Sequence, residues 1–364
     1  MNKIIIAAFG FYPEPHGIAQ AAYRQALALH ALGYQITVIT RSQTTETFPF
    51  KLISIDKKVA YQSLLQTADA DVFFFHGWHN WVSEWVMEVF PLQGKTVLVS
   101  HGTNFDVNFG GFRGTLWWLR KRWGATRFPQ KMSRFDHFVF LSDKPEHQRM
   151  SDLMLVKKQK MSNYSIIPNG VKPGFSHSKT PDFFKENSIQ TSNILLCVAN
   201  FHYAKGQREL LQWFLELDLV DTALVLIGST FNTFSAHLKK LAGNNLNKTV
   251  FIFEQLKEEE IAAAYTEATL FVSATYTEVQ PLVLLDAMAA GLPFICRDVG
   301  VVSDLEGGIC FKYEADFKQK VIELLGNSSL RKELESEGFK AVQHKYNWKK
   351  IGQQYHQLIQ DLTK

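Results

Sequence analysis

Cysteine is scarce in this sequence, with three residues among 364: Cys197, Cys296 and Cys310. They are odd in number, widely separated and not spaced as metal ligands, which excludes a disulfide framework and a cysteine-rich metal site. Scattered thiols of this kind are typical of a reducing compartment. We therefore expect reduced core cysteines in a cytoplasmic protein.

Long apolar runs are also absent. A membrane-spanning helix needs about 20 consecutive apolar residues, and no stretch of this chain approaches that length. The apolar run at residues 4–8 is too short for a secretory signal, and the residues that follow it, 10–15, form turns and not a cleavage site. We interpret this run as a first buried strand and expect no transmembrane helix.

A strong excess of charge is missing as well, since 39 basic and 35 acidic residues give a formal net charge of +4. So mild a charge predicts no bulk binding of nucleic acid. No G-x-G-x-x-G follows the first strand, which argues against a nicotinamide dehydrogenase. The 46% of apolar residues permits sizeable cores, and the length suits two domains.

What the sequence does contain is a regular alternation of short apolar runs with helical patterns. Strand-like runs occur at residues 4–8, 34–40, 71–76, 96–100, 136–142, 193–198, 223–228, 250–256 and 268–273. Polar or glycine-containing residues follow them, and ligands of open α/β sheets bind beyond the carboxyl ends of strands. The pattern predicts an α/β protein built from Rossmann-like βαβ units.

One stretch, residues 277–298, concentrates the candidate site. A strand leads into a loop with Glu278, and a helix that begins near Pro281 carries Asp286. A helix start binds anions because its first N–H groups have no partner within the helix. The N–H groups expected to face the ligand are those of Val279, Gln280 and Leu282. An anion site between two carboxylates suits a nucleotide sugar, which has phosphates in the middle and hydroxyl-rich ends.

This stretch resembles the Glu-x7-Glu motif of retaining glycosyltransferases with the two-domain GT-B fold, specifically the large family 4. In that family the first Glu contacts the transferred sugar and the second contacts the ribose. The resemblance implies these roles for Glu278 and for Asp286, which is one methylene shorter. It also implies two Rossmann-like domains facing across a cleft, residues 1–171 and 172–346, with a C-terminal helix at 347–364 returning to the first.

Other positions match the donor site of the family. Lys205-Gly206 corresponds to a Lys-Gly pair whose lysine contacts the diphosphate, whereas Asn200 stands where the family commonly has arginine. Asn200 offers only a neutral hydrogen bond, and charge-assisted bonds are roughly twice as strong. The resemblance places Gly228 near the phosphate or ribose, and Glu254 on the loop that reads the base.

In the first half, the pattern at residues 21–32 predicts a helix, and His16-Gly17 stands before it, where the family has paired glycines in a loop facing the cleft. His16 is either an acceptor contact or a surface imidazole. Gly17 would let backbone N–H groups approach the diphosphate or the acceptor. The resemblance places His101 beside the donor sugar and the leaving group. His76 and His79 either face the same cleft or are held by local loop backbone. We expect no metal, because His76, His79 and His101 lie on different strands without an acidic partner and the family generally needs none.

Residues 107–135 carry seven basic and no acidic side chains, interleaved with large aromatic ones. The candidates for an acceptor or membrane contact here are Arg120, Lys121, Arg122, Trp117 and Trp118. This mixture suits an anionic membrane surface, and equally an anionic lipid-linked or phosphorylated acceptor. RNA binding is another interpretation, and a solvated helix that packs its tryptophans inward is the fourth.

Taken with the resemblance, the sequence predicts a retaining glycosyltransferase that moves a hexose from a nucleotide diphospho-sugar, expected to be a UDP-sugar, to a hydroxyl of a glycan or lipid-linked acceptor. Surface polysaccharide synthesis at the inner face of the membrane is the expected setting. The nucleotide sugar is a co-substrate, and no cofactor, metal or nucleic acid is expected. A nucleotide-sugar epimerase or phosphorylase of the same fold, or a non-catalytic nucleotide-sugar-binding protein, are the alternatives.

Overall fold

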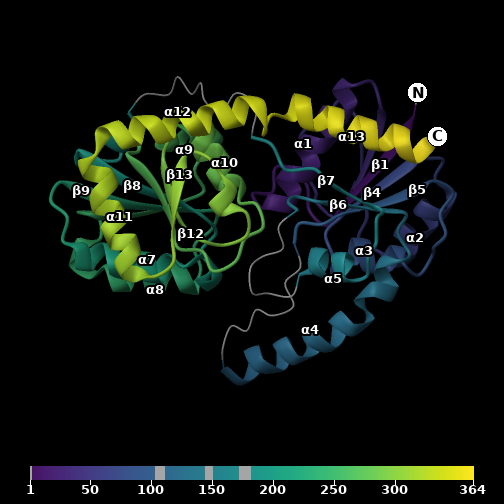
Figure 1. The fold of residues 1–364 in the computed structure, drawn as a ribbon, viewed down its shortest axis with the longest axis horizontal. Coiled ribbons are helices and arrows are strands. Elements are labelled where there is room, and N and C mark those ends of the chain that lie inside the picture. Colours follow the sequence, from purple (N-terminus) through teal and green to yellow (C-terminus); the bar gives the residue numbers. More distant parts are fainter. Residues whose placement is uncertain (1, 103–110, 144–150, 172–181) are drawn as a thin grey trace. The chain divides into compact units, whose positions relative to one another are not determined.

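The computed structural model describes residues 2–102, 111–143, 151–171 and 182–364. The chain forms two compact units, residues 1–169 with 348–364, and residues 170–347. The start of the second predicted domain, residues 172–181, lies outside the described residues. Each unit is a parallel sheet covered by helices (Figure 1), which confirms the predicted pair of α/β domains.

The first unit contains a seven-stranded sheet in the order β3-β2-β1-β4-β5-β6-β7. Its strands are β1 (Lys3–Ala8), β2 (Gln35–Thr40), β3 (Lys51–Ser54), β4 (Val72–His76), β5 (Lys95–Val99), β6 (His137–Phe140) and β7 (Tyr164–Ile166). Its helices are α1 (Gly17–Ala31), α2 (Lys58–Thr67), α3 (Trp81–Val86), α4 (Gly111–Met132), α5 (Asp152–Lys158) and α13 (Trp348–Thr363). All pairings are parallel, so the strand carboxyl ends meet at one edge.

Alternating residues of these strands face opposite sides of the sheet, which gives the first unit two apolar cores. One core joins the sheet to α1 and α13, and the other joins it to α2, α3 and the end of α4. The C-terminal helix is part of this unit, as predicted: Tyr355 packs edge-on against Phe74, with ring centroids 5.6 Å apart. In addition, the hydroxyl of Tyr34 is 2.7 Å from Nδ1 of His356.

The second unit contains a six-stranded sheet in the order β10-β9-β8-β11-β12-β13, again all parallel. Its strands are β8 (Asn193–Val198), β9 (Thr222–Gly228), β10 (Val250–Glu254), β11 (Leu270–Ser273), β12 (Phe294–Arg297) and β13 (Gly308–Phe311). Its α-helices are α6 (Phe183–Glu186), α7 (Gln207–Leu217), α8 (Thr233–Ala242), α9 (Glu258–Glu267), α10 (Leu282–Ala289), α11 (Glu314–Gly326) and α12 (Ser328–His344). Short 3-10 turns occur at Tyr203–Lys205, Gly243–Asn245 and Val302–Asp304.

In both sheets the chain reverses its direction of winding beside the first strand of the unit. β1 lies between β2 and β4, and β8 lies between β9 and β11. At such a switch point the loops leaving neighbouring strands diverge, and ligands of open α/β sheets bind in the opening beyond the carboxyl ends. The fold therefore directs attention to the loops after β1, β4, β8 and β11. In the described part of the chain, no helix has the length and apolarity to span a bilayer.

Candidate functional site

Lys205 and Glu278 come together at the switch point of the second unit. Lys205 ends the turn after β8 and Glu278 lies in the loop after β11, so adjacent strands deliver them to one place. Nζ of Lys205 donates to Oε1 of Glu278, and the two side chains are 32% and 20% exposed. The sequence assigned one to the diphosphate and the other to the sugar, and both groups remain reachable by a ligand.

Backbone contacts hold the two loops together. The carbonyl oxygen of Ala204 accepts from the N–H of Tyr276 at 2.9 Å and from the hydroxyl of Thr275 at 3.3 Å. Gly206 has φ +67°, and a Cβ there would overlap the carbonyl of Ala274. Only glycine combines this left-handed backbone with so close an approach. The packing of the two loops therefore explains why glycine follows Lys205.

A third loop supports Glu278 from the other side. Gly300, after β12, has φ +57°, and a Cβ there would overlap the carbonyl oxygen of Glu278. The N–H of Val301 donates to the carbonyl of Val279 at 3.0 Å. The backbone that carries Glu278 is thus fixed on both sides, which limits the positions open to its carboxylate.

The helix after Glu278 begins one residue later than the sequence suggests. Pro281 is the N-cap residue, with ψ 116°, and α10 starts at Leu282. The first N–H groups of α10 have no acceptor within the helix, while the side chain of Gln280 is buried, at 7% exposure. Asp286 lies half-buried on α10. The pKa of Tyr265 on α9 is raised first by the burial of its phenol and then by the carboxylate of Asp286.

The remaining donor-site candidates have individual surroundings. Asn200 is exposed after β8. Gly228 ends β9 under the ring of Phe201, which a Cβ would overlap, so its small size serves packing. The carboxylate of Glu254 accepts from the backbone N–H of Phe231 and holds the loop before α8. Contact of these three residues with a ligand stays a prediction.

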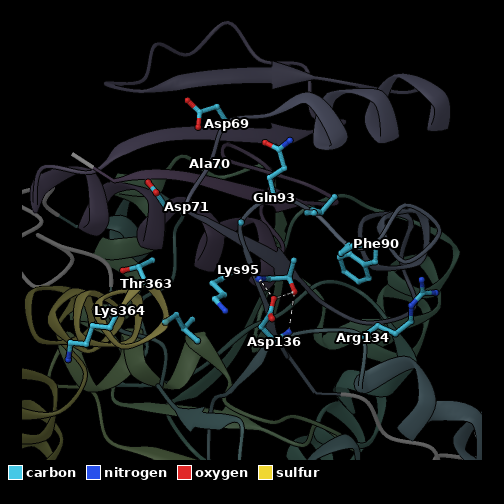
Figure 2. A pocket seen from close by; sticks show the side chains of 15 residues that line it. Asp69, Ala70, Asp71, Phe90, Gln93, Lys95, Arg134, Asp136, Thr363 and Lys364 are labelled. Carbon is cyan, nitrogen blue, oxygen red and sulfur yellow. Dashed lines mark hydrogen bonds between the residues drawn. The ribbon is translucent and has the colours of Figure 1, made fainter.

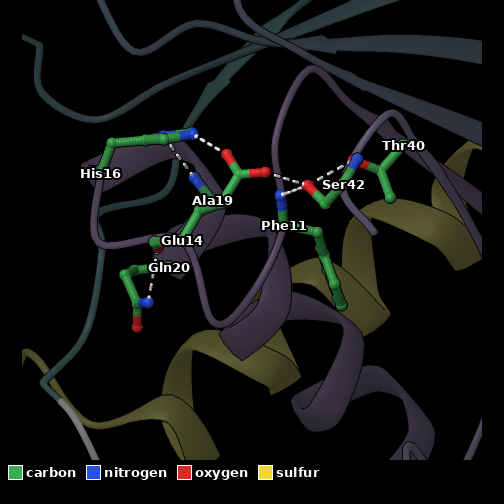
Figure 3. A network of polar contacts seen from close by, with 7 residues as sticks. All are labelled: Phe11, Glu14, His16, Ala19, Gln20, Thr40 and Ser42. Carbon is green, nitrogen blue, oxygen red and sulfur yellow. Dashed lines mark hydrogen bonds and ion pairs between the residues drawn. The ribbon is translucent and has the colours of Figure 1, made fainter. Parts of the chain in front are cut away.

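In the first unit the loop after β1 is held by a polar network (Figure 3). The carboxylate of Glu14 accepts from the hydroxyl of Ser42 and lies 2.8 Å from Nε2 of His16. Nδ1 of His16 accepts from the N–H of Ala19 at 3.2 Å and thereby caps α1. Since Nδ1 is the acceptor, Nε2 carries the proton and donates to Glu14.

The helix therefore starts earlier than predicted from its apolar pattern, and Gly17 is the first residue of α1 and not a loop residue. The ring of His16 also stacks on Phe9, with centroids 4.6 Å apart. The sequence treated His16 as a surface or acceptor-binding imidazole. The structure uses it to build the loop, and its contact with an acceptor stays a prediction.

His101 belongs to a chain of hydrogen bonds. Its Nε2 is 2.9 Å from Nδ1 of His76, whose Nε2 is 2.6 Å from Oε1 of Gln25 on α1. Burial, followed by the electrostatic interaction with His16, lowers the pKa of His101 to about 4. Burial, followed by His101, lowers the pKa of His76 well below its usual value. Both rings are therefore neutral at physiological pH.

His79 is separate from this chain. It has φ 55°, and its Nδ1 lies 3.7 Å from Oε1 of Glu84 on α3. Hydrogen bonding to His79 is the largest of the effects that lower the pKa of Glu84 to about 2, with Lys131 adding to it. Local structure thus explains His79. Among the described residues, no three His, Cys, Asp or Glu side chains gather as a metal site.

Residues 111–132 of the basic segment form α4, and the side chains described there are largely exposed. Arg120 and Arg122 face solvent, and the guanidinium of Arg122 lies 5.2 Å from the ring centroid of Trp118. The side chains of Trp117 and Lys121 lie outside the described part of the structure. Three large apolar side chains other than the predicted contact residues are half or more exposed, Leu116 at 50%, Leu119 at 51% and Trp123 at 61%.

A hollow of about 910 Å³ lies elsewhere in the first unit. It sits at the amino ends of β4, β5 and β6, where Figure 2 shows Lys95, Asp136 and Arg134. One oxygen of Asp136 already accepts from the N–H and the hydroxyl of Thr96. None of the predicted site residues lines this hollow, and it occupies the edge of the sheet opposite to the loops described above.

Comparison with known proteins shows a similarity in sequence over the second unit. Residues 178–341 match the family model of glycosyl transferases group 1. An uncharacterized glycosyltransferase of Methanocaldococcus jannaschii is 26% identical over 182 residues, which are 47% of this chain and 46% of that protein. The match thus spans about half the length of this relative.

Solved structures resemble the whole chain in fold. WaaG, a glycosyltransferase involved in lipopolysaccharide biosynthesis, has a TM-score of 0.70 at 17% identity, over 98% of this chain and 99% of WaaG. Anabaena HepE, solved in complex with UDP and glucose, has a TM-score of 0.75 at 12% identity, over 100% of both chains. These likenesses confirm the GT-B fold.

Proposed function

We propose that this chain, whose residues 178–341 match the family model of glycosyl transferases group 1, is a glycosyltransferase that moves a sugar from a nucleotide diphospho-sugar to a hydroxyl acceptor. The observation that carries the proposal is the meeting of Lys205 and Glu278 at the switch point of the second unit. A cation for the diphosphate and a carboxylate for the sugar stand side by side there, next to the start of α10.

The donor replaces the internal ion pair. Without ligand, Glu278 neutralises Lys205. A diphosphate carries more negative charge than one carboxylate, so it competes for the ammonium group, and Glu278 is then released toward the hydroxyls of the sugar. The first N–H groups of α10 add positive potential where the leaving group gains charge. UDP-hexose is the proposed donor, and the complex of HepE with UDP and glucose supports this choice.

Transfer proceeds with retention of the anomeric configuration. The bond between the anomeric carbon and the diphosphate oxygen breaks while the acceptor oxygen bonds to the same face of that carbon, and the departing phosphate oxygen takes the acceptor proton. Glu278 orients the sugar and stabilises positive charge at its ring. Lys205 and the helix start stabilise the negative charge that develops on the leaving group, so we propose that no divalent metal is needed. His101, neutral at physiological pH, serves as a hydrogen-bonding partner and not as a cation.

The acceptor is a glycan or lipid-linked glycan at an anionic membrane surface. Leu116, Leu119 and Trp123 have i, i+3, i+7 spacing, so they form one exposed stripe of α4. Arg120 and Arg122 are exposed on the same helix, and no acidic residue occurs in 107–135. Cations beside an apolar stripe with an indole are typical of helices that lie in the headgroup region. The role of WaaG in lipopolysaccharide biosynthesis supports a surface polysaccharide as the product.

A panel of nucleotide sugars tests the proposed function. We expect one donor to be hydrolysed slowly, and to be transferred faster when a lipid-linked acceptor is added. The anomeric configuration of the product, read from its NMR coupling constants, should equal that of the donor, and EDTA should leave the rate unchanged. Inversion at the anomeric carbon would contradict the retaining mechanism, and interconversion of nucleotide sugars without acceptor would favour an epimerase.

A further inference from the structure

We propose that Arg297, the last residue of β12, is a positioning residue that holds the loop of Glu278 against the turn of Lys205. The inference rests on the proposed function, because it concerns the same donor site. In the sequence Arg297 lies 19 residues beyond Glu278, near the end of the stretch 277–298, and no motif assigned it a role. In the fold Arg297 is on β12, next to β11, and its side chain contacts the loop after β11 that carries this carboxylate.

The first contact is with the backbone of that loop. Nε of Arg297 donates to the carbonyl oxygen of Ala274 at 3.2 Å. Ala274 is the first residue after β11, and its carbonyl is also the group against which Gly206 packs. Arg297 therefore fixes the point at which the two loops of the donor site touch.

The second contact is a set of three aromatic faces around the guanidinium. Its carbon lies 4.7 Å from the ring centroid of Tyr276, 5.3 Å from that of Phe311 and 5.6 Å from that of Trp213. These rings come from the loop, from β13 and from α7. A planar cation is attracted to aromatic faces and stacks on them, so the arginine joins the loop to both neighbouring elements.

Tyr276 passes this restraint to the turn of Lys205. Its N–H donates to the carbonyl of Ala204. Burial, followed by the carboxylate of Glu209 in the first turn of α7, raises the pKa of its phenol. Tyr276 thus lies between Arg297 and the start of α7, two residues before Glu278. A shift of its ring moves both members of the Lys205–Glu278 pair.

Arg297 forms no ion pair with any residue that the structure describes. Burial lowers the pKa of its guanidinium, and the nearby Tyr276 and Glu209 oppose this effect. Its geometry and its charge can therefore be separated. Lysine keeps the charge but loses the Nε–H donor and the flat surface for the three rings. Methionine keeps much of the length of the side chain and loses the charge as well as the donor and the flat surface.

The test compares the wild type with Arg297→Lys and Arg297→Met. The control is Arg331→Met, which removes another arginine of the second unit, one that donates to the backbone carbonyl of Leu325 at 2.7 Å. Hydrogen exchange of the peptides covering 203–207 and 274–281 is measured by mass spectrometry without ligand. Both Arg297 variants should exchange there about 10-fold faster, whereas the control should leave these peptides unchanged and a β9 peptide should not respond in any variant.

Kinetics and ligand binding supply the functional readout. With the donor found in the panel, both Arg297 variants should lower kcat by about 10- to 100-fold and change KM less, because a misplacement near 1 Å costs that much in rate. Inorganic pyrophosphate should bind both variants more weakly than wild type. Unchanged exchange at 274–281, or wild-type kcat in Arg297→Lys, would overturn the proposal. If the wild type transfers no sugar at all, the proposed function fails, while the exchange data still decide whether Arg297 holds the loops.

Discussion

At the scale of single residues, the Lys205–Glu278 pair is the feature that most constrains a mechanism. Both side chains are partly exposed, and ion pairs of this kind contribute only about 0.2–1 kcal/mol. A pair this weak is a poor candidate for a structural element and a good one for a site that exchanges its internal partner for a ligand. Its two members should therefore have opposite effects on the binding of a diphosphate.

Removing either charge tests this exchange. Lys205→Met should weaken the binding of inorganic pyrophosphate by about 10- to 100-fold, since hydrogen bonds to charged groups are worth about 1.5–3 kcal/mol. Glu278→Gln should instead strengthen it a few-fold, because the competing carboxylate is gone, while sugar transfer falls. Calorimetric titration measures both, with Lys318→Met as the control, whose ammonium pairs with Glu216 and Glu314. Weaker binding in Glu278→Gln would contradict the competition.

The two buried histidines of the first unit predict a dependence of stability on pH. Free histidine titrates near pH 6.5, but burial lowers the pKa of His101 to about 4 and lowers that of His76 well below its usual value. Between pH 6.5 and 4 the unfolded chain therefore binds more protons than the folded one, so stability falls as the pH is lowered through this range.

Replacing His101 with Asn should reduce the slope of the unfolding free energy against pH by an amount that corresponds to up to about one bound proton. Urea unfolding of the first unit, followed by fluorescence between pH 4.5 and 7.5, gives the slope. His237→Asn serves as the control, because His237 is exposed and belongs to the second unit. Equal slopes in wild type and His101→Asn would show that His101 is protonated in the folded protein.

At the scale of elements, the start of α1 shows what the sequence pattern can and cannot predict. The apolar repeat at 21–32 indicated a helix but not its beginning, because histidine is not among the usual N-cap residues. The cap at His16 depends on Glu14, which depends in turn on Ser42 after β2. Such a network needs tertiary contacts, and it is why Gly17 was assigned to a loop.

The cap gives a direct test of this network. His16→Ala should lower the free energy of unfolding of the first unit by about 0.5–2 kcal/mol, the usual cost of losing an N-cap. His16→Asn should recover most of the loss, because asparagine caps helices well. Urea denaturation measures both variants. If the alanine variant is as stable as the wild type, the bond from Ala19 contributes nothing.

The exposed stripe of α4 predicts binding to anionic vesicles. Changing Leu116, Leu119 and Trp123 to Ser should remove most binding in flotation with phosphatidylglycerol vesicles, because insertion of apolar side chains is lost. Changing Arg120 and Arg122 to Ser should weaken binding and reduce its salt dependence, at about 1 kcal/mol per cation. Serine at the exposed Val59, Val220 and Ile322 is the matched control. Absence of wild-type binding would refute the membrane proposal.

At the scale of the whole molecule, the alternation of strands and helices sufficed to predict two parallel sheets, because buried parallel strands have continuous apolar runs. The meeting of Lys205 with Glu278, 73 residues apart, was predicted only through a resemblance. The fold explains it, since both follow strands next to each other at a switch point. Arg297 could not be predicted at all, because its role depends on a side-chain direction that no sequence period encodes.

The return of α13 to the first unit predicts an unequal effect of truncation. A chain ending at residue 347 should have a less stable first unit. It lacks Ile351, Tyr355 and Ile359, each at most 3% exposed, and their loss uncovers apolar surface of α1 and β4. The second unit should keep its protection. Hydrogen exchange peptide by peptide measures this, and equal loss in both units would contradict the assignment of α13.

The central claim is that a diphosphate binds between Lys205 and the start of α10, and a crystal structure with UDP-hexose tests it most directly. We expect a phosphate oxygen within hydrogen-bonding distance of Nζ of Lys205, and Glu278 turned from the lysine to the sugar hydroxyls. A nucleotide bound elsewhere, with the Lys205–Glu278 pair still closed, would contradict the account.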